Sequence, residues 1–123
     1  MAAYQAFHTK SFQRCVGKHK SRRSRIEKLE EKILANPLAA PPLSHRLRIR
    51  KGIDLRGKRR RLDGDGTFVL VYMVCEECLN LGYREQGLNS CGGCEDIPRE
   101  GVILLAYGPH DETYSKHWEA DIV

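Results

Sequence analysis

The order of patterns along this 123-residue sequence predicts an α+β fold in which two N-terminal helices pack on a small antiparallel sheet. Apolar residues recur at helical spacing between positions 12 and 16, and again between 26 and 34. Two strongly apolar runs of strand length follow at 68–74 and 102–107, separated by a cysteine-containing loop. We therefore expect one domain over residues 1–123, with residues 75–98 as an insertion within it.

Local signals mark the elements of the first third of the chain. Residues 3–8 alternate weakly between apolar and polar, which favours a first strand anchored by Tyr4 and Phe7. Ser24 and Glu27 have the spacing of a capping box, so we expect the second helix to begin there. Its apolar stripe stops before Asn36-Pro37, because the residue before a proline is pushed out of helical geometry.

The middle and the end of the chain predict strands. Residues 37–43 are rich in proline and indicate a stiff connector. The pattern of a β-hairpin follows, with strands at 58–62 and 68–74 and a turn at 63–66. Residues 68–74 and 102–107 are apolar at alternate and intervening positions alike, so we expect both strands to be covered on both faces.

Charge is divided unevenly between the two halves of the sequence. Residues 1–61 carry 18 Lys or Arg and 4 Asp or Glu, whereas residues 62–123 carry 3 and 12. Such a basic half attracts phosphate backbones or an acidic protein segment. If the charge pattern were the sole observation, a basic face exposed to solvent would be the simpler explanation. The cations we expect to contact RNA lie in the segment 45–61, and they are Arg46, Arg48, Arg50, Lys51, Lys58 and Arg60.

Hydrophobicity gives no sign of a membrane segment. No run approaches the roughly 20 apolar residues that a membrane-spanning helix needs. The first ten residues lack the basic start and apolar core of a signal peptide. We therefore expect a cytoplasmic protein with no membrane partner.

Four cysteines form the most specific motif of the sequence. Cys75 and Cys78 make one C-x₂-C pair, and Cys91 and Cys94 make a second pair, separated from the first by twelve residues. Each such turn presents two sulfur atoms to one ion, and Zn²⁺ prefers four such ligands in a tetrahedron. A disulfide pair or an iron–sulfur cluster is the alternative. We expect one structural Zn²⁺ per chain, held in a zinc-ribbon-like loop between the last two strands.

Four side chains outside the cysteine loop have the chemistry needed to cleave RNA. Such cleavage uses the 2′-hydroxyl of RNA as nucleophile and needs proton transfer and cations at the phosphate. Arg59 and Arg61 alternate onto one face of the predicted hairpin strand, and His110 and Tyr114 follow the last strand. Each of these side chains also has an explanation without catalysis. The two arginines could be solvated or could bind phosphate without cleaving it. His110 could be part of a turn, and Tyr114 could be an aromatic residue of the core.

Several stretches together resemble the RelE/ParE superfamily of toxins from bacterial and archaeal toxin–antitoxin pairs. They are ILANP at the end of the second helix, LRGKRRR, FVLVY in the central strand, and VILLAYGPHDETY at the C-terminal end. The resemblance runs from about Tyr4 to Tyr114 and leaves out the cysteine loop. It implies a RelE-like arrangement of helices and sheet, with a basic residue and a tyrosine after the last strand.

The resemblance also implies an activity and partners. RelE-like members are ribosome-dependent mRNA endonucleases with no metal in their active site, and each is inhibited by a cognate antitoxin. Carried over to this sequence, Arg59 and Arg61 would stabilise phosphate charge, while His110 and Tyr114 would supply acid–base catalysis. The family often has an arginine just before the LVY of its central strand, where this chain has Val69. Either Arg60 or Arg61 substitutes for it, or cleavage is weakened or lost.

Two other functions fit the same residues. A non-catalytic basic zinc protein that binds RNA or the ribosome needs only the cations and the cysteines. A ParE-like inhibitor of gyrase would use the same fold to bind protein and would need no catalysis from His110 or Tyr114. For a toxin of either kind, we expect an antitoxin with an acidic or amphipathic helix that covers the basic surface.

Overall fold

The computed structural model describes residues 3–39, 49–50, 53–54, 58–64, 66–82 and 97–113. A four-stranded sheet with the order β1-β6-β5-β4 forms its centre, and a separate pair, β2 and β3, forms a small second sheet. The elements, in chain order, are β1 (Gln5–His8), α1 (Lys10–Lys18), the 3₁₀ turn η1 (Lys20–Arg22), α2 (Arg23–Ala35), β2 (Ile49–Arg50), β3 (Ile53–Asp54), β4 (Lys58–Asp63), β5 (Phe68–Val74), α3 (Cys75–Asn80), β6 (Gly101–Pro109) and α4 (His110–Thr113).

The α+β class predicted from the sequence is confirmed, but the sheet is mixed. β4, β5 and β6 are antiparallel neighbours, whereas β1 pairs with β6 in parallel, with Gln5 opposite Gly101 and His8 opposite Leu104. The expectation of an antiparallel sheet was therefore wrong for one edge. Alternation identifies β1 as a strand but carries no information about the direction of its neighbour, which is 93 or more residues away in the chain.

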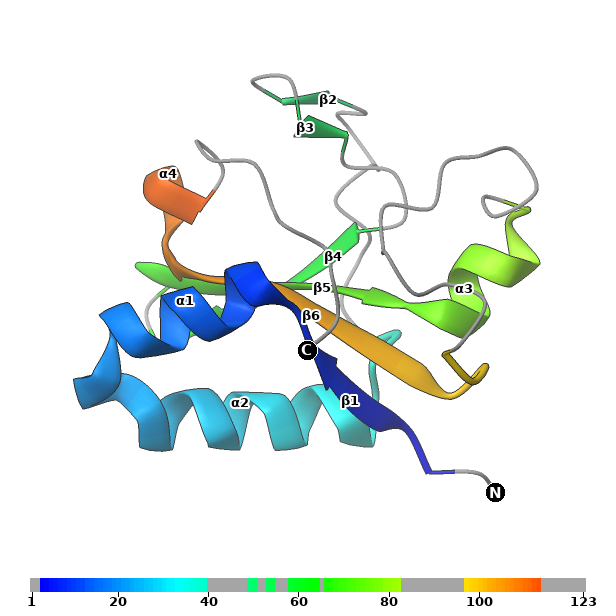
Figure 1. Cartoon of the computed structure of the whole chain (residues 1–123), viewed down its shortest axis with the longest axis horizontal. Helices are drawn as coiled ribbons and strands as arrows, with labels where there is room; N and C mark the ends of the chain where they lie inside the picture. The colour runs from blue at the N-terminus through cyan, green and yellow to red at the C-terminus, as the bar shows by residue number, and fades with distance from the viewer. Residues whose placement is uncertain are drawn as a thin grey trace.

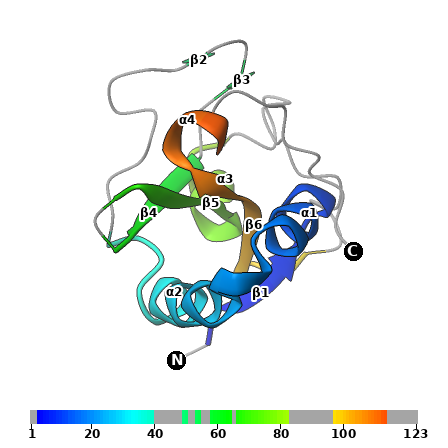
Figure 2. The same ribbon diagram turned by 90° about the vertical axis from the view of Figure 1, so that its left-hand side faces the viewer.

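The sheet is covered differently on its two faces. On one face, Leu70, Tyr72 and Val74 of β5 pack against helix residues, which include Ile26 and Ile33 of α2. On the other face, Val69, Val71 and Met73 of β5 pack with Ile103 and Leu105 of β6. Residues 69–74 and 102–107 are all buried, so the prediction of two strands covered on both sides is confirmed. Figures 1 and 2 show α2 on one side of the sheet and α4 with the β2–β3 pair on the other.

The second helix starts earlier than the capping box predicts. α2 begins at Arg23, directly after η1, and its N-cap residue, Arg22, makes no side-chain capping bond. The Arg23 N–H donates to the carbonyl oxygen of Lys20, so helical backbone already exists before Ser24. Ser24 consequently lies inside the first turn, where its side chain cannot cap. The predicted end is confirmed, because α2 stops at Ala35, one residue before Asn36-Pro37.

Thr9 is the residue that joins β1 to α1. Its hydroxyl oxygen accepts the N–H of Phe12, which caps α1, and the same hydroxyl donates to the carbonyl oxygen of Leu104 at 2.8 Å. Thr9 is fully buried, so both bonds lie out of water. The first helix is thereby attached to the central strand β6.

Candidate functional site

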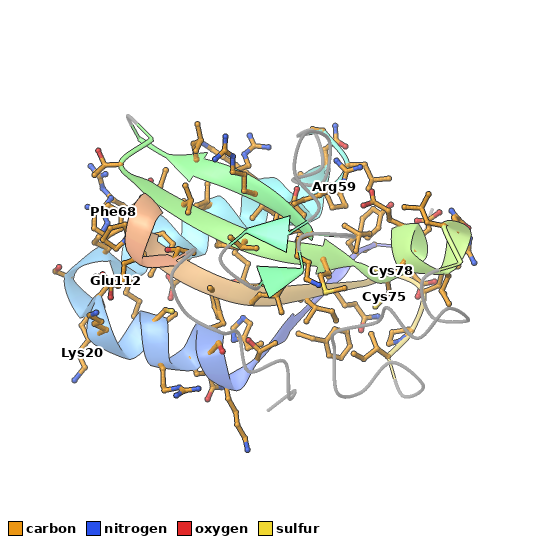
Figure 3. The ribbon with its side chains drawn as sticks, turned by 90° about the horizontal axis from the view of Figure 1, so that it is seen from above. Lys20, Arg59, Phe68, Cys75, Cys78 and Glu112 are labelled. Atoms are coloured by element: carbon orange, nitrogen blue, oxygen red, sulfur yellow. The ribbon has the colours of Figure 1, made fainter. Side chains whose placement is uncertain are left out.

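The first cysteine pair lies on a short helix that continues directly from the central strand. β5 ends at Val74 and α3 begins at Cys75, so Cys75 and Cys78 lie one helical turn apart on the same side of α3. Their exposed fractions are 9% and 6%, and they pack with Met73 and Ile103 in the core on the face of the sheet opposite α2. Cys91 and Cys94 lie outside the described residues. Figure 3 shows Cys75 and Cys78 close together at the α3 end of the sheet.

The described pair fits one half of a four-sulfur zinc site. Both thiols point into one buried region, which suits ligands that must be held away from water. Gly101 leaves the room they need, because a Cβ there would lie 3.2 Å from the Cys75 sulfur and would clash with Ile97. Among the described residues no group of three or more His, Cys, Asp or Glu side chains gathers. The remaining ligands of such a site would have to come from outside the described ranges, where Cys91 and Cys94 lie.

The two acids between the cysteines connect α3 to both edges of the sheet. The Tyr4 hydroxyl, just before β1, donates to Glu76 Oε2 at 3.1 Å. On the other edge, Arg59 of β4 donates from Nε to Glu77 Oε2 at 2.7 Å and forms an ion pair with it. The Glu77 side chain is only 10% exposed, and its Oε1 is buried with no hydrogen-bond partner among the described residues. The short helix α3 thus carries Cys75 and Cys78 and also holds a buried arginine through Glu77.

The register of β4 shows which way its cations point. Arg59 pairs with Tyr72 and Arg61 with Leu70, and directly opposed residues share a face. The prediction that Arg59 and Arg61 lie on one face is confirmed, and that face is the one covered by α2. Lys58 and Arg60 lie on the opposite face, where Lys58 is 1% exposed and Arg60 is half-buried.

The four residues predicted to cleave RNA are not all brought together within the described structure. Arg59 is engaged with Glu77 at the α3 end, whereas α4 starts at His110, just after Pro109, which pairs with Phe68. Tyr72, the partner of Arg59, is four residues along β5 from Phe68, which corresponds to about 13 Å. Arg61 is two residues nearer to that end. The His110 side chain and the whole of Tyr114 lie outside the described residues.

The residues expected to bind RNA divide into two groups. Arg46, Arg48 and Lys51 lie outside the described residues, and only the backbone of Arg50 is described, as part of β2. β2 and β3 lie on the α4 side of the sheet (Figure 1). Lys58 and Arg60 lie on that same face, but the burial of Lys58 means that its ammonium group would have to be uncovered before it could contact RNA.

A polar network that sequence reasoning missed lies at the α4 end of the sheet. The Tyr107 hydroxyl donates to Asp63 Oδ2 at 2.6 Å, and Arg22 donates to both the Tyr107 oxygen, at 2.8 Å, and Asp63 Oδ2, at 3.1 Å. Burial and the bond to Asp63 raise the pKa of Tyr107 to about 12. Burial alone would raise the pKa of Asp63, but the bonds from Tyr107 and Arg22 lower it overall. Asp63 was expected only as a turn residue, and no local signal could have paired it with Arg22.

Aromatic and ionic contacts surround this network and attach α4. The Arg22 guanidinium lies 3.7 Å from the centre of the Phe68 ring, and His19 meets the same ring edge-on. Lys18 at the end of α1 forms an ion pair with Glu112 of α4. Burial lowers the pKa of His19, with the charge of Glu112 opposing the shift. Figure 3 shows Phe68 and Glu112 at one end of the molecule and Arg59 with the cysteines at the other.

No known protein family, curated protein or solved structure matches this chain significantly. The contacts described above are therefore the basis for assigning a function. Within the described ranges, none of the helices has the length and apolar character required to cross a lipid bilayer.

Proposed function

We propose that this protein is the toxin of a type II toxin–antitoxin pair, a RelE-like endonuclease that cleaves mRNA on the ribosome. The observation that carries the proposal is the arrangement of the chain's two ends. Two N-terminal helices follow β1, the last strand β6 is central in the sheet, and α4 follows it directly on the side opposite α2. This arrangement supports the proposal because two helices packed on a sheet are what the resemblance leads us to expect, and His110 follows the buried strand β6 directly.

The chemistry proposed for this end requires no cofactor. The 2′-hydroxyl oxygen attacks the adjacent phosphorus, the bond from phosphorus to the 5′ oxygen breaks, and a 2′,3′-cyclic phosphate and a 5′-hydroxyl are formed. His110 and Tyr114 would take the 2′ proton and return one to the 5′ oxygen. Cations of β4 would stabilise the added negative charge of the transition state. Arg60 is the candidate for that role, because it lies on the face of the sheet where α4 lies (Figure 1), whereas Arg61 faces α2 and Arg59 is held by Glu77.

The cysteine pairs are proposed to hold one structural Zn²⁺ through Cys75, Cys78, Cys91 and Cys94. Four thiolates leave no open coordination position, so the ion would supply stability to the loop and no reaction step. Two features support the assignment: the burial of Cys75 and Cys78 on one helical turn, and the small residue Gly101 beside the Cys75 sulfur.

A specific observation favours a second candidate, a non-catalytic zinc protein that binds RNA or the ribosome. Arg59 and Arg61 share the face of the sheet that α2 covers, whereas α4 lies on the other side. A single phosphate cannot reach both arginines and α4 if this arrangement persists on the ribosome. Under the second candidate, the β4 cations and the zinc loop serve binding alone.

The experiment that tests the proposal is mRNA cleavage on purified ribosomes. We expect the wild-type protein to cut, Tyr114→Phe to reduce the cleavage rate by about 100-fold or more, and Arg60→Ala to reduce it similarly. Arg99→Ala, which removes an exposed arginine bonded to Asn80, is the matched control and should cut at the wild-type rate. Wild-type rates in both Tyr114→Phe and Arg60→Ala would exclude these residues from catalysis. Ribosome binding without any cleavage by the wild type would favour the second candidate.

A further inference from the structure

The connection between α1 and α2 concentrates positive charge at one end of the molecule. Residues 1–26 include seven Lys or Arg and no Asp or Glu. Four of these cations lie at the turn between the helices and are exposed, and we call them the basic corner: Lys18, Lys20, Arg23 and Arg25. The second part of α2 is different, because Lys28 and Lys32 alternate there with three glutamates.

Helix stability explains the basic corner only in part: Lys18 lies in the last turn of α1, where a cation is favoured, and Arg23 pairs with Glu27 one turn along α2. The N-terminal end of a helix carries partial positive charge and favours acidic residues, yet the first turn of α2 contains no acid and two arginines. Neither η1 nor α2 has a side-chain N-cap that would offset this arrangement. Repulsion among the cations adds to the cost. A negatively charged partner would remove both penalties.

The structure beneath the basic corner holds it rigidly. Arg22 lies between the exposed cations and is fastened from below by Asp63 and Tyr107, with its guanidinium against Phe68. Lys18 is tied to Glu112 of α4. A surface whose backbone is already ordered loses less conformational entropy when it binds. The same contacts place the basic corner at the α4 end of the molecule, where Figure 3 shows Lys20 on the same side as Glu112 and Phe68.

The composition of the basic corner identifies the class of partner. A protein–protein interface is centred on apolar or aromatic side chains that fill pockets. The exposed large hydrophobic residues of the described structure are Leu38, Leu62 and Leu81, and none of them lies in the basic corner. Cations without apolar anchors match a sugar–phosphate backbone, whose affinity comes from release of counterions. RNA therefore fits this surface better than an acidic protein segment does.

We infer that the basic corner is a second RNA-binding surface, separate from β4, that grips the phosphate backbone without reading sequence. This inference rests on the proposed RNA-directed function and names the residues that anchor the protein beside its α4 end. RNA held by the basic corner lies next to the segment that carries His110, so the corner keeps the substrate near the proposed active end without touching the reacting bond.

The test compares two variants that remove the same charge from the same helix. Arg23→Gln/Arg25→Gln removes two cations of the basic corner, and Lys28→Gln/Lys32→Gln removes two exposed cations of the second part of α2.

The binding constant for a short RNA duplex is measured at several salt concentrations. The slope of its logarithm against the logarithm of salt should become less steep by about 1.5 for the corner variant, with an affinity loss of about tenfold near 0.1 M salt. The control variant should retain nearly the wild-type slope. Circular dichroism establishes that both variants are folded.

Three outcomes of these binding measurements would support or overturn the inference. Equal slopes for the two variants would overturn the inference. It would also be overturned if the corner variant lost binding to polyglutamate but kept its affinity for RNA, because the surface would then suit an acidic protein. A corner-dependent slope in a protein that never cleaves mRNA would support the inference and refute the nuclease proposal, so the two failures are distinguishable.

Discussion

Asp63 illustrates how a single turn residue acquires a structural role through distant partners. Its carboxylate accepts hydrogen bonds from Tyr107 of β6 and Arg22 of η1, which lie 44 and 41 positions away in the chain. Both donors favour the ionised carboxylate, and together they outweigh the effect of burial, so the pKa of Asp63 is lowered. The network joins the hairpin turn to the helix connection beneath the basic corner.

At this residue scale we predict a pH-dependent loss of stability in Asp63→Asn. A lowered folded-state pKa means that Asp63 stabilises the fold above its unfolded pKa, about 3.9, and that this contribution disappears as pH falls through the folded value. The variant should lose about 1–3 kcal/mol of unfolding free energy at neutral pH, and the difference from wild type should shrink in strong acid. Urea unfolding from pH 7 to pH 2 measures this difference. A difference that stays constant over that range would contradict the role given to the charge.

The neighbours of Arg59 in the fold change the role that its sequence position suggests. Its position in a basic strand suggested phosphate binding, but the residue is only 9% exposed and its guanidinium is paired with a buried carboxylate. A buried charge without a partner is costly, so any replacement of Arg59 affects folding before it affects catalysis. Arg60 and Arg61, both half-buried, are the better positions for testing the chemistry of β4.

At the scale of single elements, α3 contacts both the core and the two edges of the sheet. Its six residues supply two cysteines to the core and two glutamates to opposite edges of the sheet. The helix therefore ties Tyr4 before β1 to Arg59 of β4 across the whole width of the sheet. A metal ion that fixed Cys75 and Cys78 would also fix the orientation of Glu76 and Glu77, because all four lie on one helical turn.

We predict that the Glu77–Arg59 pair is worth more to the fold than the Glu76–Tyr4 bond. Glu77→Gln should cost about 3 kcal/mol of unfolding free energy, because it leaves the Arg59 charge buried beside a neutral group. The matched control Glu76→Gln should cost less than about 1 kcal/mol, since its partner Tyr4 is only half-buried.

The double replacement Arg59→Met/Glu77→Met completes this test of α3. It should be less harmful than the sum of the two single replacements, because removing both partners leaves no unpaired charge. Urea unfolding of the four proteins in the cycle gives the coupling free energy. Additive effects would show that the two side chains do not depend on each other.

On the scale of the whole molecule, the described structure has two ends that differ in their side chains. The α3 end holds Cys75, Cys78 and the Arg59–Glu77 pair, and the α4 end holds the Asp63 network, the basic corner and the start of the segment with His110. β5 and β6 run between them as buried strands. This separation predicts that loss of metal destabilises the protein without removing a group from the proposed active end.

We predict one equivalent of zinc per reduced chain and a marked loss of stability on chelation. Removing the ion should lower the unfolding temperature by about 10 °C or more, because a structural zinc site contributes folding free energy directly. Cys91→Ser should abolish both the bound zinc and the response to chelator. Cys15→Ser, which changes a half-buried thiol of α1, is the control and should keep both. Metal analysis that finds no zinc in carefully reduced wild type would refute the site.

Much of the fold followed from local patterns in the sequence. The stripe of Ile26, Leu29 and Ile33 correctly gave the buried face of α2, and the hairpin of β4 and β5 was found with nearly its observed bounds. The helical form of the segment that carries Cys75 and Cys78 was missed. The correct predictions share one cause: helix and strand repeats and prolines are properties of consecutive residues.

The features that only the tertiary structure decided depend on contacts between residues that are far apart in the sequence. The parallel pairing of β1, the burial of Arg59 against Glu77, and the Asp63–Tyr107–Arg22 network each require a register between segments that the sequence does not specify. The sequence by itself determined which segments are buried strands, which helix face is apolar and where charge accumulates. Tertiary structure decided which charged side chains face each other, because burial gives a pair its energy only once distant segments have packed.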